Sequence, residues 1–135
     1  MLLSILKDAD GSRCTLTYEP ADHWLRATWR GYVNNVEAMR GAENYLSKLA
    51  LIPSPYLLHD NLALRGPWFD SLAWLEHAWL PHALRLGLRC IAHVVRPDAH
   101  LDVLALRFPK PLHGRLALQI FHEVPEAQAW LRSCQ

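Results

Sequence analysis

The sequence predicts one α/β domain, built on a mixed sheet whose N-terminal strands are antiparallel and whose later strands belong to parallel strand-helix units. The first third of the chain alternates polar and apolar residues with a period of two, which is typical of strands. Later, short apolar runs alternate with segments whose apolar residues recur every three to four positions, which is typical of strands alternating with helices. A length of 135 residues, with 51% hydrophobic residues and a net charge of +1, fits a single domain over residues 1–135 and excludes a disordered chain.

The first third predicts three antiparallel strands. Residues 3–7 and 13–19 flank a loop rich in Asp and Gly, whose residues tolerate a positive φ, and this predicts a hairpin. A turn at residues 20–23 then leads into a third strand over residues 24–33. Because these connections are short, the strands should pair antiparallel.

The period then changes to that of a helix. Asn34 is followed three residues later by Glu37, which predicts a capping box, and the helix should end before Pro53. The apolar positions of its buried face are Val36, Met39, Ala42, Leu46 and Leu49. Residues 56–60 form a short apolar run bounded by prolines and polar residues, so we expect a buried strand that ends at Asp60.

A second helix is predicted over residues 71–86. Asp70 is placed as its N-cap, and Gly87 supplies the stop after its last turn. Pro81 falls inside this helix and lacks a backbone donor, so a kink or a break is expected there.

Two more strand-helix units complete the chain. A strand over residues 89–95 precedes a helix capped by Asp98, and a strand over residues 115–123 precedes a last helix that opens at Pro125. Strands joined through helices require right-handed crossovers and parallel pairing.

This order of elements resembles the STAS domain of anti-sigma-factor antagonists, and more closely the small bacterial SpoIIAA-like, or STAS/SEC14-like, proteins. The residues that carry the resemblance are Tyr56-Leu57-Leu58-His59-Asp60, Trp68-Phe69-Asp70-Ser71, Trp74, Trp79-Leu80-Pro81, Gly87 and Ile91-Ala92. The resemblance covers nearly the whole chain in topology. It implies a non-enzymatic regulatory or protein-interaction module that can form dimers.

In the antagonist family, a partner kinase phosphorylates a serine at the start of the second helix. The matching residue here is Ser71, preceded by Asp70 as in the family. A helix N-terminus stabilises an added phosphate through its free amide donors and its positive dipole end. The alternative is that Asp70 and Ser71 serve only as a helix cap, since bulky residues, Leu72 to Trp74, replace the small residues of the family.

Polar side chains are predicted at the carboxyl ends of three parallel strands: His59 and Asp60, Arg96, and His122 with Glu123. In open sheets, ligands bind in the crevice beyond these ends. Histidine titrates near neutrality and arginine binds carboxylates or phosphates, so the group could bind an anion or perform acid-base chemistry. A zinc site would have to gather His59, Asp60 and His122. The alternative is that these residues only terminate strands.

The tryptophans fall into two groups. Trp24 and Trp29 are five residues apart on one strand and should point to opposite faces of the sheet. Trp68, Trp74 and Trp79 belong to the second helix and its approach, where they could form a binding surface or pack the helix on the sheet. The predicted ligand- or partner-binding residues are Asp60, Arg65, Trp68, Asp70, Ser71, Trp74 and Arg96.

Three functions follow, in order of preference. The first is the regulatory or interaction module, with a protein partner or self-association. The second is a carrier or sensor for a small apolar or amphiphilic ligand, which would need a pocket of roughly 300 Å³ or more. The third is a small enzyme using the strand-end His, Asp and Arg residues. A net charge of +1 disfavours nucleic acid as a partner. We further expect reduced cysteines, no cofactor or metal, no membrane insertion and a cytoplasmic location.

Overall fold

The computed structural model describes residues 1–8, 10–66, 72–97 and 115–135. Their strands form one six-stranded sheet in the order β1-β2-β3-β4-β5-β6. The strands are β1 (Leu2–Lys7), β2 (Arg13–Glu19), β3 (Trp24–Tyr32), β4 (Tyr56–Arg65), β5 (Cys90–Val94) and β6 (Ala117–Phe121). Strands β1 to β3 pair antiparallel, and β3 to β6 pair parallel. The predicted mixed sheet is confirmed.

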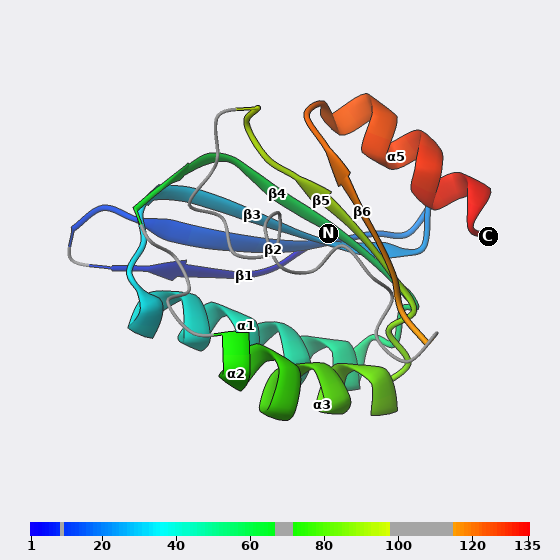
Figure 1. Cartoon of the computed structure of the whole chain (residues 1–135), viewed down its shortest axis with the longest axis horizontal. Helices are drawn as coiled ribbons and strands as arrows, with labels where there is room; N and C mark the ends of the chain where they lie inside the picture. Colours follow the sequence, from blue (N-terminus) through cyan, green and yellow to red (C-terminus); the bar gives the residue numbers. More distant parts are fainter. Residues whose placement is uncertain (9, 67–71, 98–114) are drawn as a thin grey trace.

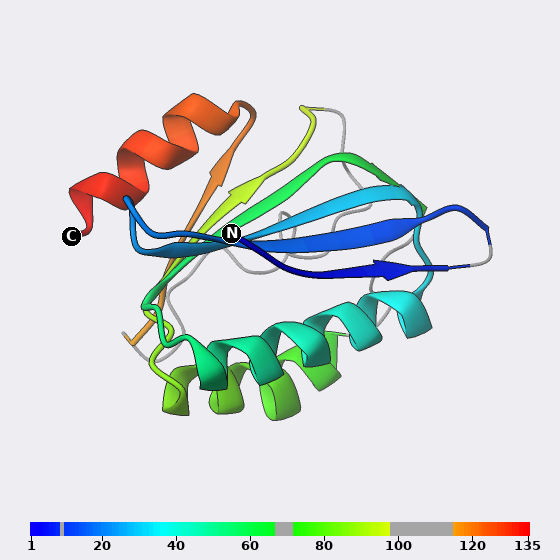
Figure 2. The same cartoon turned by 180° about the vertical axis from the view of Figure 1, so that it is seen from behind.

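Helices lie on both faces of this sheet (Figures 1 and 2). They are α1 (Asn35–Leu51), α2 (Leu72–Trp74), a π-helical turn η1 (Leu75–Trp79), α3 (Leu80–Arg85) and α5 (Val124–Ser133). Helix α1 and the helical stretch from α2 to α3 lie side by side on one face, and α5 packs on the other face. The helix predicted after Asp98 lies outside the described residues.

The predicted capping box of α1 is confirmed. The side chain of Asn34 accepts a hydrogen bond from the Glu37 amide at 2.9 Å, and the Glu37 carboxylate accepts one from the Asn34 amide at 3.0 Å. These two bonds satisfy two backbone donors near the start of the helix. They also fix the direction in which α1 leaves the sheet.

Pro81 does not break the second helix. The Leu80 amide reaches back five residues to the Leu75 carbonyl and so forms the π-helical turn η1. The backbone is helical at Trp79 and Leu80 and the helix continues through Pro81, so the predicted break does not occur; the π-helical turn directly before Pro81 is the local irregularity. Gly87, with φ of +108°, ends the helix as predicted.

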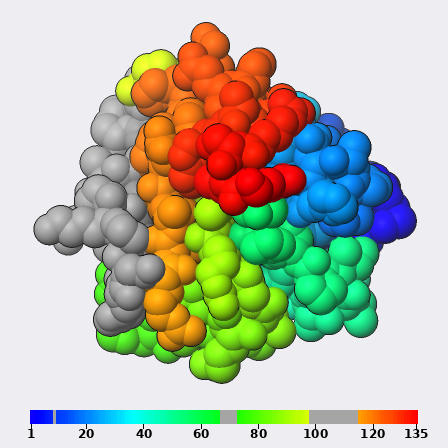
Figure 3. Space-filling model, turned by 90° about the vertical axis from the view of Figure 1, so that its right-hand side faces the viewer, coloured from blue at the N-terminus to red at the C-terminus, as the bar shows by residue number. Residues whose placement is uncertain are grey.

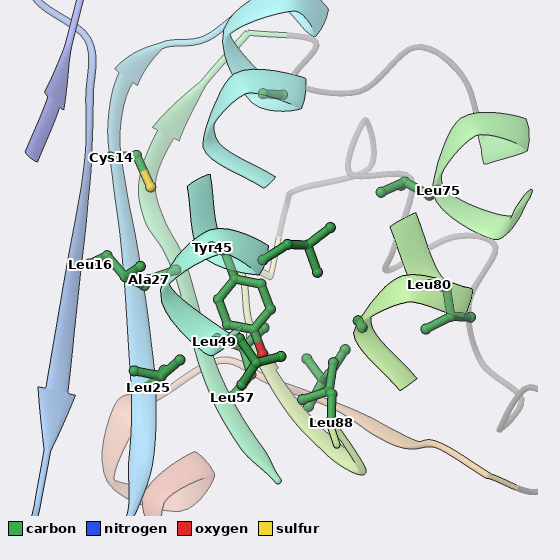
Figure 4. Packing of buried hydrophobic residues seen from close by; sticks show 14 of the residues in the cluster. Cys14, Leu16, Leu25, Ala27, Tyr45, Leu49, Leu57, Leu75, Leu80 and Leu88 are labelled. Carbon is green, nitrogen blue, oxygen red and sulfur yellow. The ribbon is translucent and has the colours of Figure 1, made fainter. Parts of the chain in front are cut away.

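Both faces of the sheet carry a core. The larger core lies under α1 and α3, where Leu25 and Leu57 from the sheet meet Leu49 from α1 (Figure 4). A smaller core lies under α5. Trp29 belongs to the first core and Trp24 to the second, which confirms that they point to opposite faces. Both indoles are buried because both faces are covered at their positions.

Helix α5 is tied to the turn between β2 and β3. The Arg132 guanidinium pairs with Asp22 at 2.9 Å and lies 5.3 Å from the centre of the Trp24 ring. Figure 3 shows the end of α5 against this turn, which is drawn in blue. The C-terminal helix is therefore an integral layer of the fold.

The prediction that β4 ends at Asp60 is wrong. The strand continues to Arg65 after an irregularity in which Thr28 pairs with Asp60 but Arg30 pairs with Ala63. The extra residue in β4 is a β-bulge, which reverses the side-chain alternation beyond it. The strand predicted over residues 56–60 therefore covers only the first half of the ten-residue strand β4.

Candidate functional site

The predicted strand-end crevice does not contain both His59 and Asp60. They are consecutive residues in the middle of β4, so their side chains point to opposite faces of the sheet. His59 faces α1 and α3, and Asp60 faces the side on which α5 packs. An enzyme or zinc site that uses both side chains together is incompatible with this arrangement.

Asp60 is part of a structural ion pair. Its carboxylate lies 3.0 Å from Nη2 of Arg26 on the neighbouring strand β3. It also accepts a hydrogen bond from the Leu62 amide at 3.1 Å, across the bulge. Because the residue is only 7% exposed, these contacts offset the cost of burying its charge. Its role as a ligand or partner contact stays a prediction.

His59 belongs to a buried hydrogen-bonded chain that the sequence did not suggest. Trp29 donates its indole N–H to Nε2 of His59 at 2.9 Å, so this nitrogen carries no proton. A neutral His59 therefore holds its proton on Nδ1, which lies 2.9 Å from Nδ1 of His93. The two imidazoles stack with their centres 4.9 Å apart. These hydrogen-bonded side chains join β3, β4 and β5 beneath the helices.

Arg96 and His122, which follow β5 and β6, lie on the surface. Arg96 is exposed, and the buried Val95 separates it from the end of β5. Nδ1 of His122, just after β6, lies 2.9 Å from the Val95 carbonyl and ties the ends of the two strands together. This contact gives His122 a structural role. The ligand-binding role of Arg96 stays a prediction.

The predicted surface around the second helix is described only in part. Trp68, Asp70 and Ser71 lie outside the described residues, so their predicted roles stay predictions. Trp74 is half-buried and packs against the larger core. Arg65, the last residue of β4, is exposed.

An exposed tyrosine stands beside Arg65, at the ends of β3 and β4. Tyr32, the last residue of β3, pairs with Arg65 and is 58% exposed. Val36, in the first turn of α1, is 65% exposed. Gly66 lies so close to the Tyr32 ring that a Cβ would come within 3.0 Å of it. We call Tyr32 and Arg65 the Tyr32 patch. Sequence reasoning named Arg65 but not Tyr32, and it assigned the exposed Val36 to the buried face of α1.

A cavity of about 50 Å³ lies between the sheet and the helices that cover it. Strands β2 to β6, α1 and the segment from η1 to the start of α3 all contribute to its lining. The lining residues that bear on its chemistry are Cys14, Trp29, Tyr45, His59, Leu75 and Trp79. The sequence identified Trp79 as a core or pocket residue but gave no hint of Tyr45.

Three side chains define the walls of the cavity. The Trp79 indole donates to the Ala42 carbonyl at 3.0 Å, and its ring lies 5.8 Å from that of Tyr45. The Tyr45 hydroxyl is buried and has no hydrogen-bond partner within the described part of the chain. Burial raises the pKa of Tyr45. Burial also raises the pKa of Cys14 to about 12, so both groups are neutral near pH 7.

A scan against protein-family models and a search of curated proteins found no match. Two solved structures are similar over nearly the whole chain. An anti-sigma factor antagonist from Mycobacterium paratuberculosis matches with a TM-score of 0.59 and 15% identity, over 94% of this chain and 99% of that chain. An uncharacterized protein of the DUF3478 family from Shewanella loihica PV-4, with a SpoIIAA-like fold, matches with a TM-score of 0.55 and 18% identity, over 95% of this chain and 99% of that chain.

Among the described residues, no helix is long and apolar enough to cross a membrane. At 15% and 18% identity, the two structural matches establish architecture. They confirm the resemblance at the level of the fold, because the mixed sheet and the helices on its faces follow the same plan. The chain has a STAS/SpoIIAA-like fold.

Proposed function

We propose that the protein is a non-enzymatic regulatory module that acts by binding a protein partner. The observation that carries the proposal is the fold shared with an anti-sigma factor antagonist over 94% of this chain. The opposed side chains of His59 and Asp60 weaken the enzymatic alternative. A net charge of +1 favours a protein or a small molecule over nucleic acid as the partner.

The Tyr32 patch is the partner-binding surface that the described residues support best. An exposed tyrosine beside an arginine has the chemistry of an interface centre, where aromatic rings and arginines contribute most of the affinity. The patch also precedes Trp68 in the chain, the residue that the sequence favours as a contact. We infer a partner that offers an apolar hollow flanked by an acidic group.

Ser71 is the proposed switch of this interaction. A phosphate there would add about two negative charges close in sequence to Arg65 and would change the affinity of the patch for an acidic partner. The substitution Ser71→Glu should then alter partner binding, whereas Ser71→Ala should leave it nearly unchanged. Equal affinities for both variants would restrict Ser71 to a capping role.

The proposal is tested by affinity capture followed by reconstitution. The tagged protein is used to isolate partners from its native cells, and the dissociation constant of each purified candidate is then measured by calorimetry. We expect Tyr32→Ala to weaken binding about tenfold or more, as loss of an aromatic anchor does. Leu51→Ala is the matched control, because Leu51 is 75% exposed at the opposite end of α1.

Two results would overturn the proposal. One is that none of the captured candidates binds the protein once the candidate has been purified. The other is a dissociation constant that Tyr32→Ala and Leu51→Ala change equally. Light scattering of the purified protein tests self-association, the other partner that the sequence suggested.

A small-ligand carrier or sensor is the second candidate function. The cavity, at about 50 Å³, falls below the roughly 300 Å³ expected of a pocket for such a ligand, so it weakens this candidate. A carrier of large lipids is therefore less well supported than a sensor of a small molecule. This candidate depends on the isolated protein alone, so it can be tested without a partner.

A further inference from the structure

One end of β2 and β3 is open on the face of the sheet that points away from α1. Cys14 and Trp29 pair with each other and belong to the core under α1, so their chain neighbours Arg13 and Arg30 point to the other face. On that face α5 packs against β4, β5 and β6 (Figure 1). It reaches β3 at Trp24, at the far end of the strand from Arg30. Arg13 and Arg30 are therefore exposed.

Three cations lie side by side in a row across this open face. Lys7 of β1 pairs with Arg13 of β2, and Arg13 pairs with Arg30 of β3. Residues directly opposite each other on antiparallel strands point to the same face, with Cβ atoms about 4.5–5.5 Å apart. All three residues are exposed. We call Lys7, Arg13 and Arg30 the basic row.

The charge of the basic row is not neutralised within the described part of the chain. Its side chains form no ion pair there, whereas Arg26, on the same face, pairs with Asp60 at 3.0 Å. Asp8, which follows Lys7 in the chain, is paired instead with Arg40 of α1 at 2.6 Å. Like charges directly opposite each other on neighbouring strands destabilise a sheet. A surface that keeps such a row is suited to bind an anionic partner.

The surroundings of the basic row favour a protein over a nucleic acid as that partner. Ile5, two residues before Lys7, points to the same face and is 44% exposed. Tyr32 of the Tyr32 patch follows Arg30 by two residues. Exposed aromatic and apolar side chains beside arginines are typical of protein interfaces. A nucleic-acid-binding domain normally carries a larger excess of positive charge than the +1 of this chain.

The spacing of the basic row matches one face of a helix. Neighbouring strands lie about 4.7–4.9 Å apart, so the row presents one positive charge about every 5 Å across the sheet. Residues i and i+4 of a helix have Cβ atoms about 5–6 Å apart. Alternate residues of an extended strand are farther apart, at about 6.4–6.8 Å. A helix that crosses the strands therefore places its carboxylates closer to the three cations.

We propose that the basic row binds an acidic helix of the protein partner, with carboxylates at positions i, i+4 and i+8. This inference rests on the proposed function, because it takes the partner to be a protein, and it deepens that function by naming the chemistry of the partner. The helix lies across β1 to β3 and extends the contact that begins at the Tyr32 patch. Arginine forms strong paired hydrogen bonds with carboxylates, so Arg13 and Arg30 contribute most of the attraction.

The test compares two synthetic helical peptides of the same composition, rich in alanine and glutamine. One carries three glutamates at i, i+4 and i+8, and the other carries them at i, i+5 and i+10, about 140° apart around the helix. Each is titrated into the full-length protein at an ionic strength of about 10 mM, where exposed charges are weakly screened. Backbone NMR signals report binding. We expect the first peptide to shift the amides at the basic row and to bind at least about fivefold more tightly than the second.

Two charge reversals of equal size separate the basic row from net charge. Arg13→Glu should weaken binding of the first peptide about tenfold or more. It should also raise the Tm of the free protein, because a carboxylate at that position is flanked by Lys7 and Arg30. Arg85→Glu is the matched control, since Arg85 is exposed on α3 beyond the other face of the sheet. It should change the affinity less than about twofold.

The inference is overturned if neither peptide shifts the amides at the basic row, or if both peptides bind equally well. It is also overturned if Arg13→Glu and Arg85→Glu weaken binding alike, or if a single-stranded oligothymidylate binds the row more tightly than the first peptide. These titrations contain no native partner, so their failure leaves the Tyr32→Ala test of the proposed function unaffected. Conversely, a row that binds the first peptide in a protein for which no captured candidate binds would refute the proposed function alone.

Discussion

Replacing Gly41 by alanine tests how closely α1 packs on the sheet. In the interior of a helix, alanine is normally favoured over glycine by about 1 kcal/mol. Gly41 lies opposite the Trp29 ring, and an added Cβ would stand 2.3 Å from one ring carbon and 2.6 Å from another. Carbon atoms in contact prefer a separation of about 3.5–4.0 Å, so α1 or Trp29 must move by more than about 1 Å.

The expected loss of stability follows from these distances. Overpacking of a core costs about 1–3 kcal/mol. Displacing Trp29 would also strain or break its bond to His59, and an unpaired buried group adds about 1–3 kcal/mol. After subtracting the helix-propensity gain of about 1 kcal/mol, we expect a net loss of about 1–5 kcal/mol. For a chain of 135 residues this lowers Tm by roughly 4–18 °C.

The assay is urea unfolding followed by circular dichroism. Ser47, exposed on α1, supplies the control: Ser47→Ala compared with Ser47→Gly measures the helix propensity alone. In a Trp29→Phe background the cost of Gly41→Ala should shrink, since the smaller ring leaves room for the methyl group. The reasoning is refuted if Gly41→Ala stabilises the protein, or if its cost is the same in both backgrounds.

Three further outcomes follow from the buried polar groups. Arg26→Ala should destabilise the fold by about 1–3 kcal/mol in urea unfolding, because it leaves the Asp60 carboxylate buried without its cation, whereas an effect below about 0.5 kcal/mol would contradict the structural ion pair. Tyr45→Phe should raise the free energy of unfolding of the ligand-free protein by up to about 1 kcal/mol, because it removes the unpaired hydroxyl; a loss above about 1 kcal/mol would mean that this hydroxyl has a partner. The pKa of Cys14 rises from its ordinary value of 9.0 to about 12 on folding, so stability should fall as the pH rises from 9 to 12. Urea unfolding of Cys14→Ala in reducing buffer should show a shallower fall over that window, and an unchanged slope would contradict the burial of the thiol.

Local sequence patterns predicted the parts of the fold that local interactions determine. The capping box at Asn34 and the stop at Gly87 depend on residues within one helical turn, so their spacing in the sequence was sufficient. The period-two pattern likewise placed Trp24 and Trp29 on opposite faces. Parallel pairing followed from the alternation of strands with helices.

Features that depend on tertiary contacts were mispredicted or missed. The polar pair Asp60-Asn61 looked like the end of a strand, yet β4 continues because Arg26 neutralises Asp60 and a bulge accommodates the extra residue. Pro81 predicted a kink or a break, but the helix instead carries a π-helical turn directly before Pro81 and continues through it. No local pattern could bring Trp29, His59 and His93 together, because they lie on three different strands.

The predicted binding site around the approach to the second helix stays a prediction. Arg65, which the sequence named, ends the strand that leads to that helix, and the exposed Tyr32 beside it was not foreseen. Val36, however, fits the apolar period of α1 although it is exposed, since periodicity alone does not show where a helix overhangs its sheet. The cavity could not be predicted, because it depends on how Tyr45, Trp29 and Trp79 pack together.

Hydrogen exchange of the complex with a captured partner tests the central claim most directly. If the protein is a regulatory module that binds through the Tyr32 patch, partner binding should protect the backbone amides around Tyr32 to Val36 and at Arg65 and Gly66. Amides in the last turn of α5, which is tied to the β2–β3 turn at the other end of β3, should exchange at the same rate with and without the partner. Protection confined to α5, or no partner-dependent protection at the patch, would contradict the account.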